Sequence, residues 1–175
     1  MIMCRGHNDI VSKTHVFESN DNKKLNIEKP SHFHKRNMNP WNKDIEDCAI
    51  RAVSAALWMK YETVCQIFGK ECVPGIGLRG TEGINLKIIK HVLKNFFSRD
   101  VRQVTKMTIG QFCEEHSGQG RFLIASSGHM VYADLTPGRN WFMDTFDSSR
   151  LPVRSYMQVK GILRKDDPNS LAYRK

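Results

Sequence analysis

The spacing of apolar residues changes once along this chain, and that change limits the fold more than any other feature. From residue 44 the apolar side chains recur at intervals of three and four, which is typical of one face of a helix: Ala49, Ala52, Val53, Ala56 and Leu57. After Gly118 the interval becomes two, as in half-buried strands. Helices first and an antiparallel sheet second indicate an α+β domain.

The helical half divides into four segments. The first begins near Asp44, with Cys48 in its first turn, and the second covers Tyr61–Phe68. Residues 74–80 contain three glycines and predict a loop, followed by a third helix over Thr81–Phe97. Its apolar face is predicted to contain four residues: Ile84, Ile88, Val92 and Phe96. The T-x-x-Q sequence at Thr108 is typical of a capping box and predicts a fourth helix to about His116.

The second half predicts four successive strands. They cover residues 121–126, 129–135, 140–145 and 152–158, and are rich in β-branched and aromatic residues. Acidic residues near the start of the first helix suit its N-terminal dipole and can cap its free amides: Asp44, Glu46 and Asp47.

The charge pattern indicates one domain between two basic ends. Residues 1–40 hold seven basic and four acidic residues, residues 150–175 hold seven and two, and the stretch between them is nearly neutral, within a net charge of +9. We therefore expect a flexible polar extension over 1–38 that contacts the body near Phe33, a domain over 39–158 and a basic tail over 159–175. Nucleic acid is expected to bind only weakly, through these ends.

The five cysteines are odd in number and irregularly spaced, which favours reduced thiols in the cytoplasm over a disulfide framework. Cys113 lies near His116, and His32 and His34 form an H-x-H pair, but no C-x-x-C motif accompanies them. We expect no metal and no cofactor. No apolar stretch has the length of a membrane span, so no membrane association is expected.

Cys48 is the candidate nucleophile. A thiol acts as a nucleophile in its thiolate form, and both a helix N-terminus and a neighbouring imidazole favour that form. Its candidate base is His129, at the start of a predicted strand. If Pro137 and Gly138 form the loop of the following hairpin, Val131 faces Asp144 and His129 faces Phe146.

Asp144 then lies on the same face as His129, as its diagonal neighbour, where a carboxylate can orient the ring. A hairpin loop longer by one residue turns Asp144 away, and Asp147 is then the reserve carboxylate. The Cys48 amide can supply one donor to an oxyanion. The side-chain amide of Asn42, six residues upstream, can supply a second; its alternative role is that of a turn residue after Asn39-Pro40.

The motifs around these residues are similar to those of known proteins. The stretch from Asp47 to Ala52 (D-C-x-x-R-A), the S-G-H sequence ending at His129 and the D-T-F-D sequence from Asp144 resemble a family of small papain-like proteins of bacteria and their phages. Their order and spacing are also similar to those of peptidases that remove double-glycine leaders from bacteriocins. Papain-like peptidases place glutamine where this chain has Asn42. The resemblance covers residues 39–158 and implies a papain-like fold and thiol chemistry.

The resulting hypothesis is a cysteine hydrolase, a peptidase or isopeptidase, that cleaves an amide bond in a protein or peptide. Cys48 attacks, His129 protonates the leaving amine, and water clears the thioester. Two alternatives stay open. One is an acyltransferase or deamidase on the same fold, and the other is an inactive binding module that holds a partner or nucleic acid through its basic ends.

Overall fold

The structure, a computed structural model, describes residues 32–43, 46–75, 77–79, 84–98, 100–104, 106–162 and 165–171. Every element below belongs to one compact unit, Ser31–Lys175, and residues 1–30 lie outside the described residues. No helix in these described ranges is long and apolar enough to cross a membrane.

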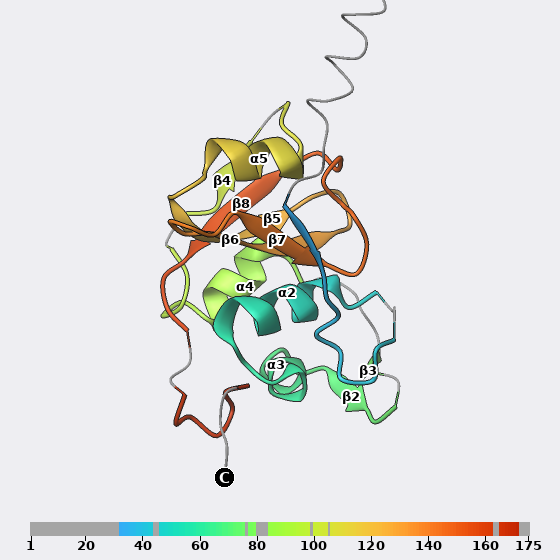
Figure 1. The fold of residues 1–175 in the computed structure, drawn as a ribbon. Coiled ribbons are helices and arrows are strands. Elements are labelled where there is room, and N and C mark those ends of the chain that lie inside the picture. The colour runs from blue at the N-terminus through green and yellow to red at the C-terminus, as the bar shows by residue number, and fades with distance from the viewer. Residues whose placement is uncertain are drawn as a thin grey trace, which may run out of the picture. The chain divides into compact units, whose positions relative to one another are not determined.

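A six-stranded sheet forms the centre of this unit, with the strand order β1-β7-β6-β5-β8-β4 (Figure 1). All its neighbouring strands are antiparallel except β1 and β7, which run parallel. The bounds are β1 Phe33–Lys35, β4 Arg102–Gln103, β5 Gly120–Ala125, β6 Met130–Leu135, β7 Trp141–Asp144 and β8 Ser155–Val159. The α+β class is therefore confirmed, with a mostly antiparallel sheet.

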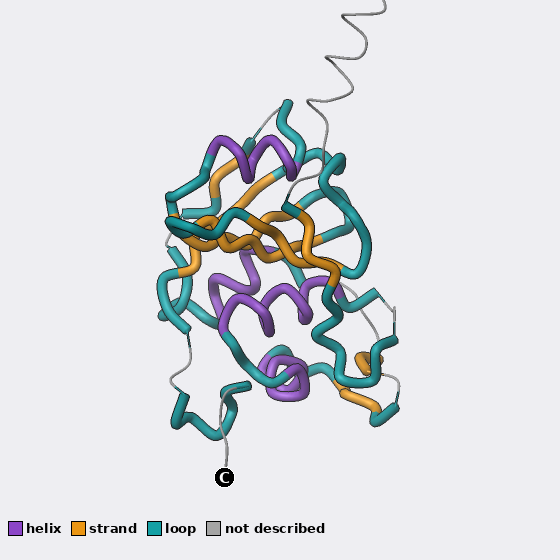
Figure 2. The backbone as a smooth tube through the Cα atoms, in the orientation of Figure 1, coloured by secondary structure: helices purple, strands orange, loops and turns teal. Residues whose placement is uncertain are grey.

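The described part of the chain contains four helices: α2 Cys48–Leu57, α3 Tyr61–Ile67, α4 Leu86–Val92 and α5 Ile109–Glu115. Figure 2 shows α5 on one side of the sheet and the other three on the opposite side. The capping box of α5 is confirmed, because Thr108 accepts from the Gln111 amide and Gln111 accepts from the Thr108 amide.

Each side of the sheet has its own apolar core. On one side α2, α3 and α4 pack against alternate strand residues such as Leu123, Tyr132 and Met157. On the other side α5 packs against their neighbours in sequence, including Phe122 and Val131. All of β6 is buried, since the strand lies between the two cores. The two cores thus hold β6 in place, and His129 directly precedes its first residue, Met130.

The structure corrects three local predictions. Helix α4 begins at Leu86, because the Asn85 side chain accepts from the Lys87 and Ile88 amides and caps it there. Its buried face contains Leu86 and Ile89, whereas Ile88 and Val92 are exposed. The predicted loop over 74–80 contains a strand, since β3 Gly77–Arg79 pairs antiparallel with β2 Glu71–Val73.

Segments near both ends of the chain join this unit. The expected contact near Phe33 is confirmed as β1, in which Phe33 pairs with Phe142. At the other end, the Lys60 amide donates to the Asn169 carbonyl at 2.9 Å, and the Leu171 amide donates to the Trp58 carbonyl at 2.8 Å. Residues 165–171, within the range predicted as a tail, therefore lie against the turn that follows α2.

Candidate active site

Cys48 is the first residue of α2 and is half-buried. The backbone amides of a helix's first turn have no partner within the helix, so they point toward any group placed at that end. The N-cap residue is Asp47, but its side chain makes no capping hydrogen bond. The prediction that this carboxylate caps the helix is thus wrong, and the cause lies in the contacts that Asp47 makes instead.

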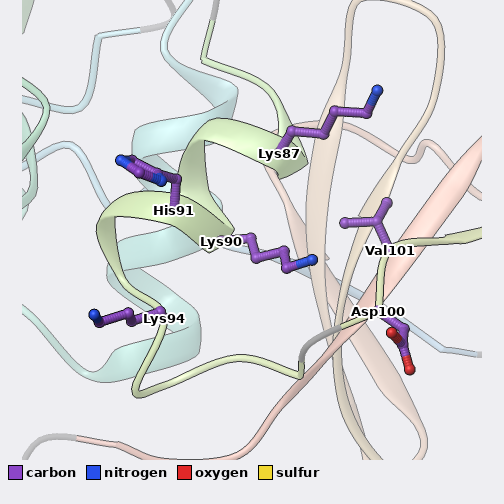
Figure 3. A pocket seen from close by; sticks show the side chains of 6 residues that line it. All are labelled: Lys87, Lys90, His91, Lys94, Asp100 and Val101. Carbon is purple, nitrogen blue, oxygen red and sulfur yellow. The ribbon is translucent and has the colours of Figure 1, made fainter.

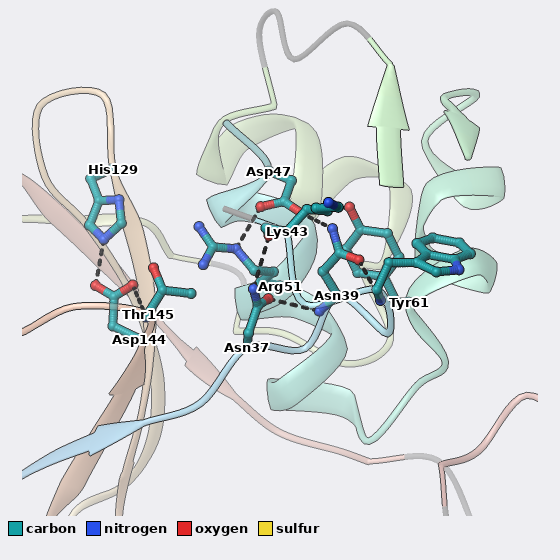
Figure 4. Close-up of polar contacts among 10 residues, drawn as sticks. Asn37, Asn39, Lys43, Asp47, Arg51, Tyr61, His129, Asp144 and Thr145 are labelled. Atoms are coloured by element: carbon teal, nitrogen blue, oxygen red, sulfur yellow. Dashed lines mark hydrogen bonds and ion pairs between the residues drawn. The ribbon is translucent and has the colours of Figure 1, made fainter. Parts of the chain in front are cut away.

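The Asp47 carboxylate, at the position before Cys48, is buried in a polar cluster (Figure 4). Its Oδ1 lies 2.6 Å from Nε of Arg51, and its Oδ2 accepts from the Tyr61 hydroxyl at 2.6 Å. Asn39 donates to the same Oδ2 at 3.2 Å. Arg51 is one turn further along α2, while Tyr61 opens α3. The cluster therefore fixes the residue before Cys48 to both helices and to the loop before them.

His129 and Asp144 meet as the hairpin register predicts. Tyr132 pairs with Met143 and Ala133 with Phe142, so the loop has the expected length. The Arg139 amide closes the turn onto the Thr136 carbonyl at 2.8 Å, with Gly138 at φ 78°.

In this register Nε2 of His129 lies 2.6 Å from Oδ2 of Asp144. Nδ1 is then the ring nitrogen that remains to serve Cys48. The alternative of a hairpin loop longer by one residue, which would turn Asp144 away from the ring, does not occur.

Groups other than His129 also hold Asp144 in place. Its Oδ2 also accepts from the Ser148 hydroxyl at 2.6 Å, and its Oδ1 accepts from the Thr145 amide at 2.7 Å. Its backbone carbonyl accepts from the Arg36 amide, just after β1, at 2.8 Å. The side chain is only 3% exposed. These contacts hold the carboxylate in an orientation in which Oδ2 faces the His129 imidazole.

The electrostatic state of His129 follows from these neighbours. Burial disfavours the imidazolium and by itself lowers the pKa, but hydrogen bonds with Asp144 and with Cys48, and the charges of both, raise the pKa of His129 from 6.5 to about 9. The ring is therefore protonated at neutral pH, next to the thiol and in contact with an anion. This is the arrangement in which a thiolate and an imidazolium stabilise each other.

The other described thiols are in a different environment. Burial raises the pKa of Cys65 to about 12 and the pKa of Cys113 to about 12, and it also raises the pKa of Cys72. Deprotonation of these three thiols is suppressed at neutral pH, as is typical of structural cysteines. Cys4 lies outside the described residues.

The structure shows the contacts of two further predicted residues. Asn42 is exposed, has φ 53°, and donates its backbone amide to the Asn39 carbonyl at 2.9 Å, so it has the turn role described above. Its function as an oxyanion donor stays a prediction. Asp147 is exposed, and its Oδ1 accepts from the Ser149 amide at 3.0 Å, which closes the turn after β7.

Two site residues were not predicted. Ser148 is buried against Asp144. The only feature of the sequence that points to it is the presence of a hydroxyl side chain four residues after Asp144. Phe146 is 48% exposed, and its ring centroid lies 5.0 Å from that of His129. The register paired Phe146 with His129, but spacing alone does not show that an exposed ring covers the imidazole.

No protein-family model, curated protein or solved structure matches this chain. The function is therefore argued from the geometry of Cys48, His129 and Asp144.

Proposed function

We propose that the protein is a papain-like cysteine hydrolase that cleaves an amide bond, either a peptide or an isopeptide bond. The observation that supports this most is the position of His129. Its Nε2 lies 2.6 Å from a buried carboxylate, and its pKa is raised to about 9 by hydrogen bonds with that carboxylate and with Cys48. A thiol at a helix N-terminus with a charged imidazole partner is an activated nucleophile.

The reaction proceeds in two halves. The Cys48 thiolate attacks the carbonyl carbon, and the Cys48 amide at the start of α2 donates to the resulting oxyanion. When the oxyanion collapses, the carbon–nitrogen bond breaks and the His129 imidazolium gives its proton to the departing amine. The neutral imidazole then takes a proton from water, the hydroxide attacks the thioester, and the carbon–sulfur bond breaks to release the acid and restore the thiolate.

The test of nucleophile activation needs no substrate. Iodoacetamide is added at pH 6.5 and each alkylated cysteine is identified by mass spectrometry over time. Cys48 should react at least tenfold faster than Cys72, which is also half-buried but has a raised pKa. His129→Ala should slow the alkylation of Cys48 and leave Cys72 unchanged. Equal rates at the two thiols would refute an activated nucleophile.

Hydrolysis is tested on a mixture of denatured proteins, in which new N-termini are identified by mass spectrometry. Wild-type protein should create them and Cys48→Ala should not. Rapid alkylation of Cys48 without any cleavage, but with transfer of an added amine onto glutamine side chains, would favour the acyltransferase alternative over the hydrolase.

A further inference from the structure

A groove runs along α2, away from Cys48. It has a volume of about 360 Å³, and its apolar lining includes Trp58, Trp141, Met143 and Leu171. Trp141 packs against two other rings, since its ring centroid lies 5.1 Å from that of His34 and 5.8 Å from that of Tyr132. Trp58 and Leu171 are 41% and 39% exposed. Large apolar side chains that remain exposed in one cluster are typical of binding surfaces.

The groove lies next to the candidate active site. A smaller cavity is lined by Cys48 and Asp144, and it shares four lining residues with the groove: Arg36, Met38, Ala55 and Met143. The groove therefore adjoins the cavity beside Cys48 and Asp144, and it reaches Trp58 at the C-terminal end of α2.

The backbone at Trp58 is in a conformation that large residues seldom adopt. Trp58 is the C-cap of α2 with φ 55° and ψ 38°, in the left-handed region that favours glycine. The structure holds it there through its amide, which donates to the Ser54 carbonyl, and its carbonyl, which accepts from the Leu171 amide. A strained bulky residue at a groove is the pattern expected where a side chain serves a binding function.

The rim of the groove is positively charged. Lys35, Arg36 and Arg139 line it, and Asp and Glu are absent from the lining that the structure describes. Arg139 donates to Asp134 at 3.1 Å, but its side chain is still 60% exposed. An apolar floor with a basic rim is complementary to a peptide segment that combines a bulky apolar side chain with neighbouring carboxylates.

We propose that this groove binds the substrate chain at a distance from the cleaved bond, by an apolar residue flanked by Asp or Glu. The inference rests on the proposed function, because it assigns the groove to the substrate of Cys48. Helix α2 separates Cys48 from Trp58 by ten residues, or about 15 Å at 1.5 Å per residue. An extended peptide covers that span in about five residues at 3.3 Å each. The recognised segment thus lies about five residues from the scissile bond.

The test uses the Cys48→Ala protein, immobilised and incubated with a synthetic library of random decapeptides whose retained members are sequenced by mass spectrometry. We expect sequences with Leu, Met or an aromatic residue next to Asp or Glu to be enriched at least tenfold over the input. Adding Trp58→Gly should abolish this enrichment. Glycine adopts a positive φ without strain, so this change removes the ring but preserves the helix end; a cooperative melt verifies the fold.

Helix α4 supplies matched controls, since one of its faces is exposed and its residues do not line the groove. Val92 is 41% exposed, as Trp58 is, and Val92→Ala should retain the enrichment. For charge, Lys35→Glu should remove the preference for acidic neighbours, whereas Lys87→Glu should not. Lys87 lines a separate basic hollow with Lys90 and Lys94 (Figure 3).

An unbiased set of retained peptides, or the same enrichment with Trp58→Gly, would overturn the groove assignment. The binding result does not depend on thiol chemistry, because Cys48 is absent from the protein used. Failure of the hydrolase proposal appears instead in the alkylation and cleavage assays, so the two failures are distinguishable.

Discussion

The Ser148 hydroxyl donates a 2.6 Å hydrogen bond to Oδ2 of Asp144, the same carboxylate oxygen that contacts the His129 ring. Ser148 thus acts on the imidazole through the carboxylate, and both side chains are buried. Its contribution is to orient a charged group, which makes it a positioning residue.

Ser148→Ala should lower kcat for peptide cleavage by roughly tenfold and leave KM nearly unchanged, because Asp144 keeps the Thr145 amide but loses one of its two fixed donors. Ser149→Ala, at the next position, is the control and should retain full activity. Steady-state kinetics on a peptide found in the cleavage assay provide the measurement. A rise in KM with constant kcat would contradict a positioning role.

The pH dependence follows from the raised pKa of His129. A group whose folded pKa lies above its unfolded value stabilises the fold fully below the unfolded value, here 6.5, and loses that contribution as pH rises through about 9. The free energy of unfolding should therefore fall between pH 6.5 and 9, and kcat should fall above pH 9 as the proton donor is lost.

Asp144→Asn should move the His129 titration to lower pH, because it removes the charge and keeps the shape of the carboxylate. NMR of the imidazole resonances measures both proteins. An unchanged titration in this variant would show that Asp144 does not raise the pKa of His129.

The order of severity among substitutions tests the triad itself. Cys48→Ala and His129→Ala should abolish cleavage, and Asp144→Ala should cost less, because it removes only the orienting group. Asp147→Ala should have little effect, since that carboxylate is exposed and closes a turn. Cleavage kinetics of the folded variants provide the measurement. An inactive Asp147→Ala variant together with an active Asp144→Ala variant would mean that the wrong carboxylate was assigned.

Asn42→Ala should slow cleavage by roughly ten- to a thousand-fold if its amide serves the oxyanion, which is the usual cost of removing one such donor. Asn42→Gly is the control for the backbone, because glycine also adopts the positive φ of this position. Similar losses of cleavage rate in both variants would support the Asn42 side-chain amide as an oxyanion donor. Full activity in both would leave Asn42 with the turn role alone.

Arg51→Ala should lower the free energy of unfolding by about 3 to 5 kcal/mol, because it leaves the buried Asp47 carboxylate without its ion-pair partner. Arg139→Ala is the matched control: its ion pair with Asp134 is exposed on the arginine side, so the cost should stay below about 1 kcal/mol. Urea denaturation of both variants gives the comparison, and equal costs would contradict a structural role for the Asp47 cluster.

The sequence was most informative where local chemistry decides the structure. The Pro137-Gly138 sequence favoured the hairpin register that the structure has, and in this register Asp144 lies beside His129. The T-x-x-Q box fixed the start of α5 for the same reason, since both partners lie within one turn.

Long-range contacts and ambiguous patterns were not predictable. The segment around α4 has two apolar stripes, so spacing could not choose Ile89 over Ile88 as the buried residue. The role of Asp47 depends on Tyr61, fourteen positions away, and a short polar sequence at Phe33 gives no sign of a parallel partner in β7.

The parallel pairing of β1 with β7 decides which strand has an unpaired edge. Without β1, the outer backbone groups of β7 would face solvent along the strand that ends at Asp144. With β1 in place, Lys35 pairs with Asp144 and the Arg36 amide binds its carbonyl at 2.8 Å. Strand β1 and Arg36 thus hold the main chain of the orienting carboxylate in place, and loosening those few residues would disturb the base without changing either Cys48 or His129.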